Sequence, residues 1–206
     1  MNTIDVFKFL QEEIHTTIMA TCDNKGLPVT CAVDIMDYDE NGLYFLTAKG
    51  KNFYNRLKEG GYLALTGIHG ESTMTRIAVS VCGKVREIGE DRLQRLLDKN
   101  PYMYEIYPGE QSRKALSVFC LFEGKGEWFD LSKKPIERFA FAFGGEQTAA
   151  NEYFVTDDCV GCGKCRDVCP QNCIDIKDKA VIRRNNCLHC GNCVVACPVG
   201  AVTKRC

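Results

Sequence analysis

Residues 159–170 read CVGCGKCRDVCP, and residues 187–198 read CLHCGNCVVACP. Both stretches follow the pattern C-x-x-C-x-x-C-x-x-x-C-P, and equivalent cysteines are 28 residues apart. Three cysteines at two-residue intervals can wrap a tight turn around one group, with Gly163 and Gly191 giving the backbone freedom there. Soft sulfur ligands suit iron–sulfur clusters better than imidazole or carboxylate ligands. The doubled run therefore predicts two iron–sulfur clusters in the last third of the chain.

The two runs resemble those of bacterial two-cluster 4Fe–4S ferredoxins. In that family the fourth cysteine of each run ligates the cluster of the other run. The resemblance implies that residues 153–206 form a small α+β ferredoxin domain. One cluster would be held by Cys159, Cys162, Cys165 and Cys197. The other would be held by Cys187, Cys190, Cys193 and Cys169.

Structural zinc and disulfides are the alternative uses of so many cysteines. Zinc does not require the third cysteine of each run or the Cys-Pro ending. The N-terminus does not resemble a signal peptide, which disfavours disulfides. Cys173 falls in a small-residue position of the repeat, and Cys206 has no counterpart, so neither is expected to be a ligand. Four further cysteines are expected to act as small hydrophobic residues, with a role near a cofactor left open for Cys31: Cys22, Cys31, Cys82 and Cys120.

The length and charge of the chain fit a cytoplasmic protein of two domains. Its 206 residues exceed what a ferredoxin needs, and residues 1–143 can bury a core of their own. Residues 144–152, GGEQTAANE, are small and polar, as a linker would be. The net charge of −1 argues against a nucleic-acid partner, and the absence of a long apolar run argues against a membrane span.

The first domain reads as antiparallel strands with a few helices. An amphipathic helix is expected around Val6 and Leu10, followed by strands at 16–22 and 29–36 that flank a hairpin turn. Further strands are expected at 43–47, 62–69 and 75–88, with helices near 53–57 and 90–98. Two last strands, 116–122 and 125–131, are expected to flank a turn at Glu123-Gly124. This spacing predicts a barrel or a sandwich.

Residues 4 to about 132 resemble the pyridoxamine 5′-phosphate oxidase-like, FMN-binding split barrel, in the branch of nitroimidazole-resistance-type proteins. Three segments carry the resemblance: 18–22 with 26–29, 43–51, and 81–85. It implies an antiparallel split β-barrel, a homodimer, and FMN in the groove between subunits.

The resemblance also implies which residues meet the flavin. Residues expected along the ring are Thr30, Cys31, Ala32 and Val33. Residues expected at the ribityl chain and phosphate are Thr47, Ala48, Lys49, Lys51 and Asn52. A phosphate needs a cation and donors, and these residues come just before an expected helix whose N-terminal amides would face the anion. Without the resemblance, a Lys-Gly-Lys loop is more often a solvated turn.

Two departures argue against pyridoxamine phosphate oxidation itself. Ala78 stands where the oxidase has a glutamine that touches the flavin, and residues 128–131 read WFDL where the oxidase has its arginine-leucine substrate motif. That enzyme also passes electrons to oxygen, which exposed 4Fe–4S clusters tolerate poorly.

The sequence thus predicts an anaerobic iron–sulfur flavoprotein oxidoreductase that passes electrons between two 4Fe–4S clusters and FMN to reduce a small molecule. The alternatives are an electron carrier between a ferredoxin pool and a partner enzyme, with no substrate of its own, and a redox sensor. A redox partner protein, a ferredoxin or a reductase, is expected. The barrel could instead hold haem or a deazaflavin. His15, His69 and His189 look isolated, so no acid–base pair is expected and the flavin would be the only catalytic group.

Overall fold

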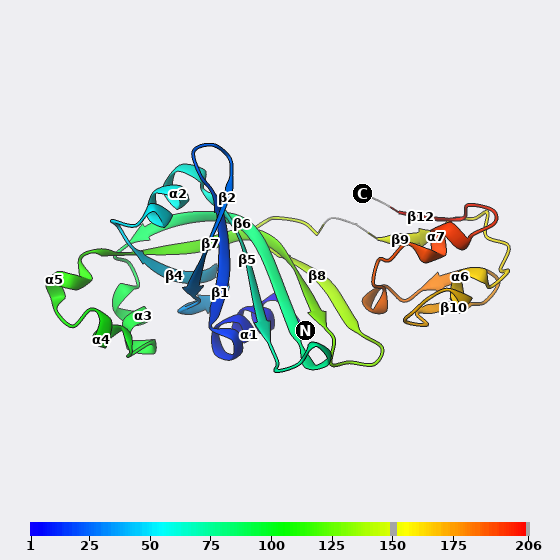
Figure 1. Ribbon diagram of the computed structural model, residues 1–206, viewed down its shortest axis with the longest axis horizontal. Helices are drawn as coiled ribbons and strands as arrows, with labels where there is room; N and C mark the ends of the chain where they lie inside the picture. Colours follow the sequence, from blue (N-terminus) through cyan, green and yellow to red (C-terminus); the bar gives the residue numbers. More distant parts are fainter. Residues whose placement is uncertain (149–151, 205–206) are drawn as a thin grey trace. The chain divides into compact units, whose positions relative to one another are not determined.

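The computed structural model describes residues 1–148 and 152–204 (Figure 1). Its contacts divide the chain into two compact units. The first unit comprises Met1–His69, Ala78–Glu127 and Phe141–Gln147. The second comprises Gly70–Ile77, Trp128–Ala140 and Thr148–Cys206. Part of the expected linker at 144–152 lies outside the described residues. Cys206 also lies outside them.

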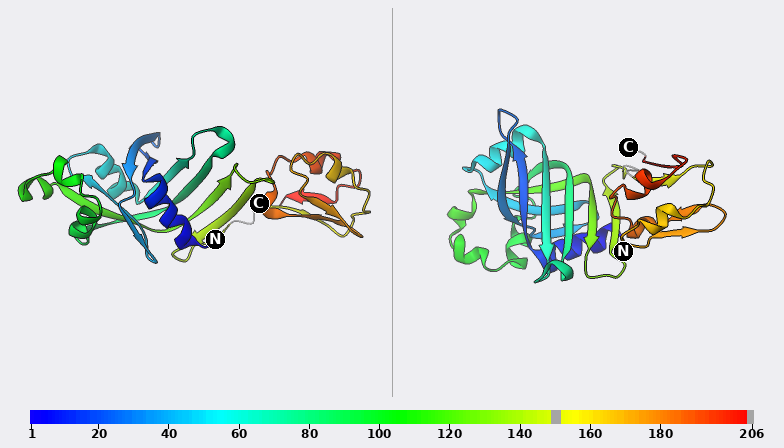
Figure 2. Two further views of the ribbon diagram at one scale, coloured as in Figure 1. Left: turned by 90° about the horizontal axis from the view of Figure 1, so that it is seen from below. Right: turned by 45° about the vertical axis from the view of Figure 1, so that its right-hand side comes forward.

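One sheet of eight strands, most of whose residues belong to the first unit, has the strand order β2-β1-β5-β6-β7-β4-β3, with β8 paired with β7. Figure 2 shows β1, β5, β6 and β7 side by side. Pairing is antiparallel where β1 meets β2 and β5, and where β4 meets β3 and β7. The strands are β1 (Thr16–Cys22), β2 (Pro28–Asp34), β3 (Asp37–Asp39), β4 (Gly42–Ala48), β5 (Tyr62–His69), β6 (Ile77–Gly89), β7 (Leu116–Asp130) and β8 (Glu137–Phe143).

Alternating burial explains the strands of the first unit. In β5 every second residue from Leu63 is buried, and β6 alternates in the same way from Val79 to Val85. Strand β4 is buried on both faces except near its end, with Phe45 stacked on Phe119 of β7. One apolar side of the sheet therefore makes the core, as a closed or half-closed barrel requires.

The N-terminal helix is shorter than its apolar pattern suggests. Helix α1 (Thr3–Phe9) begins at Asn2, whose side chain accepts a hydrogen bond from the backbone N–H of Asp5. It continues as a π-helix, η1 (Leu10–Ile14), and ends at His15. Residues Val6 and Leu10 are fully buried, as the periodicity predicts.

The expected turn at Glu123-Gly124 is wrong, because β7 runs through it as one strand. The glycines there let β6 and β7 approach each other closely. A Cβ on Gly124 would lie 2.5 Å from the Cys82 carbonyl oxygen, and one on Gly83 would lie 2.1 Å from the Glu123 carbonyl oxygen. Strands β6 and β7 are thus neighbours that cross where only glycine fits.

The helices of the first unit lie at the ends of the strands. Helix α2 (Asn52–Gly60) follows β4, buries Phe53 and Leu57, and ends at Gly61 in the left-handed conformation. Between β6 and β7 lie α3 (Leu93–Lys99), α4 (Met103–Ile106) and α5 (Glu110–Arg113). Their Leu96, Leu97 and Met103 join a core cluster with β4 and β7. Only the first of these three helices was expected from the sequence.

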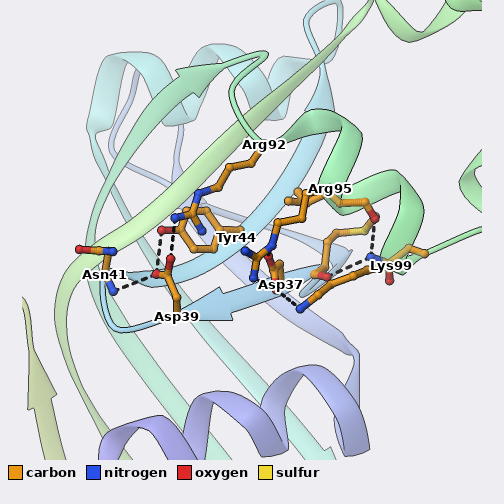
Figure 3. Close-up of polar contacts among 10 residues, drawn as sticks. Asp37, Asp39, Asn41, Tyr44, Arg92, Arg95 and Lys99 are labelled. Carbon is orange, nitrogen blue, oxygen red and sulfur yellow. Dashed lines mark hydrogen bonds and ion pairs between the residues drawn. The ribbon is translucent and has the colours of Figure 1, made fainter.

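Charged side chains tie α3 to the β3–β4 hairpin (Figure 3). Asp37 is fully buried and accepts a 2.6 Å hydrogen bond from Arg95 Nε as well as an ion pair from Lys99. Arg92 forms a 2.6 Å ion pair with Asp39 and lies over the ring of Tyr44. These contacts fix the segment that leads into α4, which begins four residues beyond Lys99.

The cysteine-rich part of the second unit is small and built from short elements. Strand β9 (Tyr153–Val155) pairs antiparallel with β12 (Val202–Lys204), and β10 (Ile174–Ile176) pairs with β11 (Ala180–Ile182). Helices α6 (Lys164–Asp167) and α7 (Asn192–Ala196) each lie within one cysteine run, and the 3₁₀ turn η3 (Arg184–Asn186) lies between the runs. A second 3₁₀ turn of this unit, η2 (Thr73–Thr75), lies outside the cysteine-rich part. Among the described residues, no helix is long and apolar enough to cross a membrane.

Candidate functional site

Two hollows in the second unit are each lined by cysteines from both runs. The first is lined by the first three cysteines of one run and the last cysteine of the other: Cys159, Cys162, Cys165 and Cys197. The second has the complementary set: Cys187, Cys190, Cys193 and Cys169. The fold therefore brings together the same two quartets that the ferredoxin resemblance implies.

Glycines and backbone amides position these thiols. Gly163 and Gly191 have φ of 79° and 82°, and they start α6 and α7 so that the third cysteine of each run turns inward. The backbone N–H of Ala201 donates to Cys197 Sγ at 3.2 Å. Burial opposes ionisation of Cys197, but backbone N–H groups from Val199 onward outweigh it and lower its pKa. Such donors stabilise the thiolate that a cluster ligand must be.

A fifth cysteine lies at the second hollow. Cys173 is buried and lines it, with its Sγ 3.4 Å from Cys169 Sγ. The repeat predicts a small side chain at this position, which the burial of Cys173 fits. The repeat gave no sign that its sulfur would face the hollow.

The four thiols of each quartet line a hollow without any imidazole or carboxylate, a set of donors that suits an iron–sulfur cluster. In tetrahedral zinc sites, four sulfurs lie about 2.3 Å from one point. Within residues 1–148 and 152–204, no three His, Cys, Asp or Glu side chains converge in that way. Each hollow is lined by the four thiols that a cubane cluster would need, one at each iron.

A separate pocket of about 300 Å³ lies in the first unit, between the end of β2, the end of β4 and helix α4. This size falls at the lower end of the range for small-molecule sites. The lining is mostly apolar and includes Met36, Leu46 and Phe53. Its polar side chains include Thr47, which is buried, and Asp34.

Most residues that the split-barrel resemblance assigns to FMN line this pocket. They are Cys31, Ala32, Val33, Thr47, Ala48 and Lys51. The pocket lining does not include Thr30, Lys49 or Asn52. The Lys49 ammonium instead donates to the Lys114 carbonyl oxygen at 3.1 Å and lies 3.8 Å from Glu90.

Positive charge is concentrated at one wall of the pocket. Lys51 immediately precedes α2, whose N-terminus has no side-chain cap. The Tyr54 N–H donates to the Lys51 carbonyl oxygen at 3.0 Å, which leaves the N–H groups of Asn52 and Phe53 at the start of the helix for an anion. Burial raises the pKa of the Cys31 thiol, and the positive charges of Arg56 and Lys51 partly offset that rise. A phosphate would therefore find a cation and free backbone donors at this end of the pocket.

The prediction that the histidines are isolated is wrong for His15. Its Nε2 lies 3.1 Å from the Tyr102 hydroxyl oxygen and 3.5 Å from Asp34 Oδ2. Both Tyr102 and Asp34 line the pocket. Tyr102 follows α3 in the sequence by three residues, and nothing in its own periodicity marks it, because the contact is made across the fold. His69 and His189 have ring contacts with Phe9 and Tyr153.

Comparison with known protein families connects both sites to the sequence. Residues 5–128 match the family model described as pyridoxamine 5′-phosphate oxidase. The chain belongs to that family. Residues 158–201 match the model described as a 4Fe–4S dicluster domain. The family match spans the pocket, and the dicluster match spans both cysteine quartets.

Solved structures support the split-barrel fold of this pyridoxamine 5′-phosphate oxidase family member. A NimC/NimA family protein from Clostridium acetobutylicum is 15% identical, covers 69% of this chain and 92% of its own, and gives a TM-score of 0.58. A protein from the same organism related to general stress protein 26 is 14% identical, with coverage of 68% and 92% and a TM-score of 0.51. A haem-binding protein from Mycobacterium smegmatis is 12% identical, covers 66% of this chain and 56% of its own, and gives a TM-score of 0.52. Comparison with curated proteins gave no match.

Proposed function

We propose that the protein is an iron–sulfur flavoprotein oxidoreductase that passes electrons between two 4Fe–4S clusters and FMN to reduce a small molecule. The observation that carries the proposal is the pair of hollows, each lined by three cysteines of one run and the fourth of the other. Clusters bound there would carry single electrons, and a flavin can combine them into a two-electron reduction.

Each quartet would hold one cluster. The first would use Cys159, Cys162, Cys165 and Cys197, and the second Cys187, Cys190, Cys193 and Cys169. Backbone N–H groups that donate to the sulfurs would tune the clusters, since hydrogen bonds to sulfur are one of the protein's controls on reduction potential. Such bonds to predicted ligands include those of Ala180 to Cys159, Cys173 to Cys169 and Ala201 to Cys197.

The pocket in the first unit would hold FMN. Lys51 and the N-terminus of α2 would bind the phosphate, and Cys31, Ala32 and Val33 of β2 would lie along the ring. The apolar lining would exclude water from the ring, which strengthens the electrostatic interactions inside the pocket. The M. smegmatis neighbour is described as haem-binding, so haem is the competing cargo of this fold. The cation at Lys51 and the open amides favour a phosphate-bearing cofactor over haem. Following the family, we infer a cytoplasmic homodimer.

The test compares electron transfer with and without clusters. The full chain is prepared anaerobically with iron and FMN, beside a Cys159→Ser, Cys187→Ser double variant that lacks one ligand of each cluster. Both are mixed with a reduced bacterial ferredoxin, and flavin absorbance is followed. We expect the double variant to keep its FMN but lose rapid flavin reduction. Equal rates in the two proteins would contradict a route through the clusters.

The same preparation separates the enzyme from the carrier. The reduced protein is mixed with small electron acceptors, namely quinones and nitroarenes. Rapid reoxidation by one of them would support an enzyme with its own substrate. Reoxidation by protein partners alone would favour the electron carrier.

A further inference from the structure

Three side chains form a hydrogen-bonded chain at the wall of the pocket. The Tyr102 hydroxyl donates to Asp34 Oδ2 at 2.6 Å, and both residues line the pocket. His15 does not line it, but its Nε2 lies 3.1 Å from the Tyr102 hydroxyl. Its side chain is 33% exposed, so it can exchange protons with water. The chain thus leads from solvent to the pocket.

The backbone holds His15 in this position. His15 ends the π-helix η1 and has a φ of 59°, a conformation that costs energy in a residue with a side chain. Its N–H donates to the Leu10 carbonyl at 2.8 Å, and its carbonyl accepts from the N–H of Ile35 at 2.8 Å. Ile35 directly follows Asp34, so the same strand end fixes both the histidine and its acidic partner. π-Helical turns occur often at functional sites.

Counting hydrogens shows which atoms of His15 and Tyr102 can donate. His15 Nδ1 lies 3.3 Å from the Gln11 carbonyl oxygen, which can only accept, so Nδ1 carries a hydrogen. The single hydroxyl hydrogen of Tyr102 goes to Asp34, its nearer neighbour. The contact between His15 and Tyr102 is then satisfied only when Nε2 also carries a hydrogen. Every contact is complete when His15 holds a second proton, directed at the Tyr102 oxygen.

We propose that Tyr102 donates the proton that the flavin takes up on reduction in this pocket, with His15 resupplying it and Asp34 holding its hydroxyl in place. This inference rests on the proposed function, because it requires FMN in the pocket. Electrons that arrive from 4Fe–4S clusters bring no protons. Two-electron reduction of a flavin takes up at least one proton, so a site fed by clusters needs a proton donor of its own.

The step balances within the named groups. Two electrons come from the clusters. The Tyr102 hydroxyl would turn from Asp34 to the flavin, and its Oη–H bond would break as an N–H bond formed on the ring. The Nε2–H bond of His15 would break as the Tyr102 hydroxyl was restored. His15 then takes a proton from water. Burial and the hydrogen bond to Asp34 raise the pKa of Tyr102, so its hydroxyl keeps its proton at neutral pH until the reaction draws on it.

The variants are Tyr102→Phe, which removes the donor, and His15→Gln, which removes the resupply. The protein has a second tyrosine and a second histidine that give a matched control for each variant. Tyr104 donates to Asp98 at 2.8 Å, and His69 Nδ1 lies 3.3 Å from the Glu13 carbonyl oxygen, but neither residue lines the pocket. Tyr104→Phe and His69→Gln therefore remove the same kinds of bond elsewhere.

Each protein is loaded with FMN and clusters, its FMN affinity is measured, and flavin reduction by excess dithionite is followed by stopped flow in H₂O and D₂O. We expect Tyr102→Phe and His15→Gln to bind FMN as the unsubstituted protein does. Their reduction should slow by at least about tenfold, within the range that general acids contribute, and the solvent isotope effect should rise as proton delivery becomes limiting. Both controls should match the unsubstituted protein.

Two results would overturn the proposal while leaving the proposed function standing. One is normal FMN binding in both variants with unchanged reduction rates and isotope effects. The other is a slower reduction explained by weaker FMN binding, which would make Tyr102 a binding residue only. Failure of the unsubstituted protein to bind FMN would instead remove the proposed function, and this inference with it.

Discussion

Cys169 belongs to the first cysteine run but lines the same hollow as Cys187 of the second. Cys197 does the reverse and lines the hollow of Cys159. Each hollow therefore needs both runs to be folded and packed together. Binding of one cluster would stabilise the packing that the other requires, because metal-binding free energy is also folding free energy.

Cys169→Ser should therefore damage the second cluster and spare more of the first. We expect its loss of iron, about four of about eight per chain, and its electron paramagnetic resonance spectrum to match those of Cys187→Ser. Cys159→Ser should give the other pattern. A Cys169→Ser protein whose spectrum resembles that of Cys159→Ser would overturn the crossed assignment. Cys22→Ser, at an exposed cysteine far along the sequence from both runs, serves as the control.

Lys51→Ala should weaken FMN binding by about 10- to 100-fold, because it removes a charged phosphate ligand. Iron content should not change. Lys49→Ala is the matched control, since Lys49 carries the same charge two residues away but contacts Lys114 and Glu90. Equal losses of affinity, measured by fluorescence titration of the flavin-free protein, would bring Lys49 back into the site as the sequence resemblance implied. No loss in either variant would place the phosphate elsewhere.

Asp37→Ala should lower the free energy of unfolding by about 1–3 kcal/mol, the range for donors that lose a buried acceptor. The effect is moderate because Arg95 and Lys99 are about half exposed and can turn to water once Asp37 is gone. Denaturant unfolding measures the change, with the exposed Asp91→Asn as control. A loss no larger than that of the control would show that this ion pair does not hold α3 in place.

Stability should fall with acid through Glu87. Burial opposes its ionisation, but hydrogen bonds from Lys58, Ser117 and Tyr54 outweigh burial and lower its pKa below the ordinary 4.5. A depressed folded pKa means that this stabilisation is complete above pH 4.5 and is lost as the pH falls through the folded value. We expect Glu87→Gln to be less stable than the unsubstituted protein at pH 6 and to show a shallower loss of melting temperature below about pH 4.5. Parallel curves for the two proteins would exclude this contribution.

The sequence predicted the parts of the fold that repeat or alternate. The two runs follow from spacing, since Cys159 and Cys187 start identical patterns, and the crossed quartets follow from the ferredoxin resemblance. Strands such as β5 and β6 follow from alternating apolar residues. The long strand β7 was missed because Gly124 looks like a turn residue, and its use for close approach to Cys82 appears only when β6 is placed beside it.

The pocket shows the same limit. The residues of β2 and the loop after β4 were predicted by resemblance, because they are contiguous in the sequence. Tyr102, Ile106 and Tyr107 were not, since they lie on a segment between β6 and β7 that no local pattern connects to the pocket. His15 and Tyr102 are 87 residues apart, and only the fold brings them within hydrogen-bonding distance.

On the proposed function, one chain carries both a flavin and two cubane clusters. The most direct measurement is the content of a protein purified without oxygen: the flavin released on denaturation and the iron per chain. We predict about one FMN and about eight iron atoms per chain, as two 4Fe–4S clusters require. About eight iron atoms with no flavin would contradict the proposed function, leaving a dicluster protein whose barrel holds another cargo.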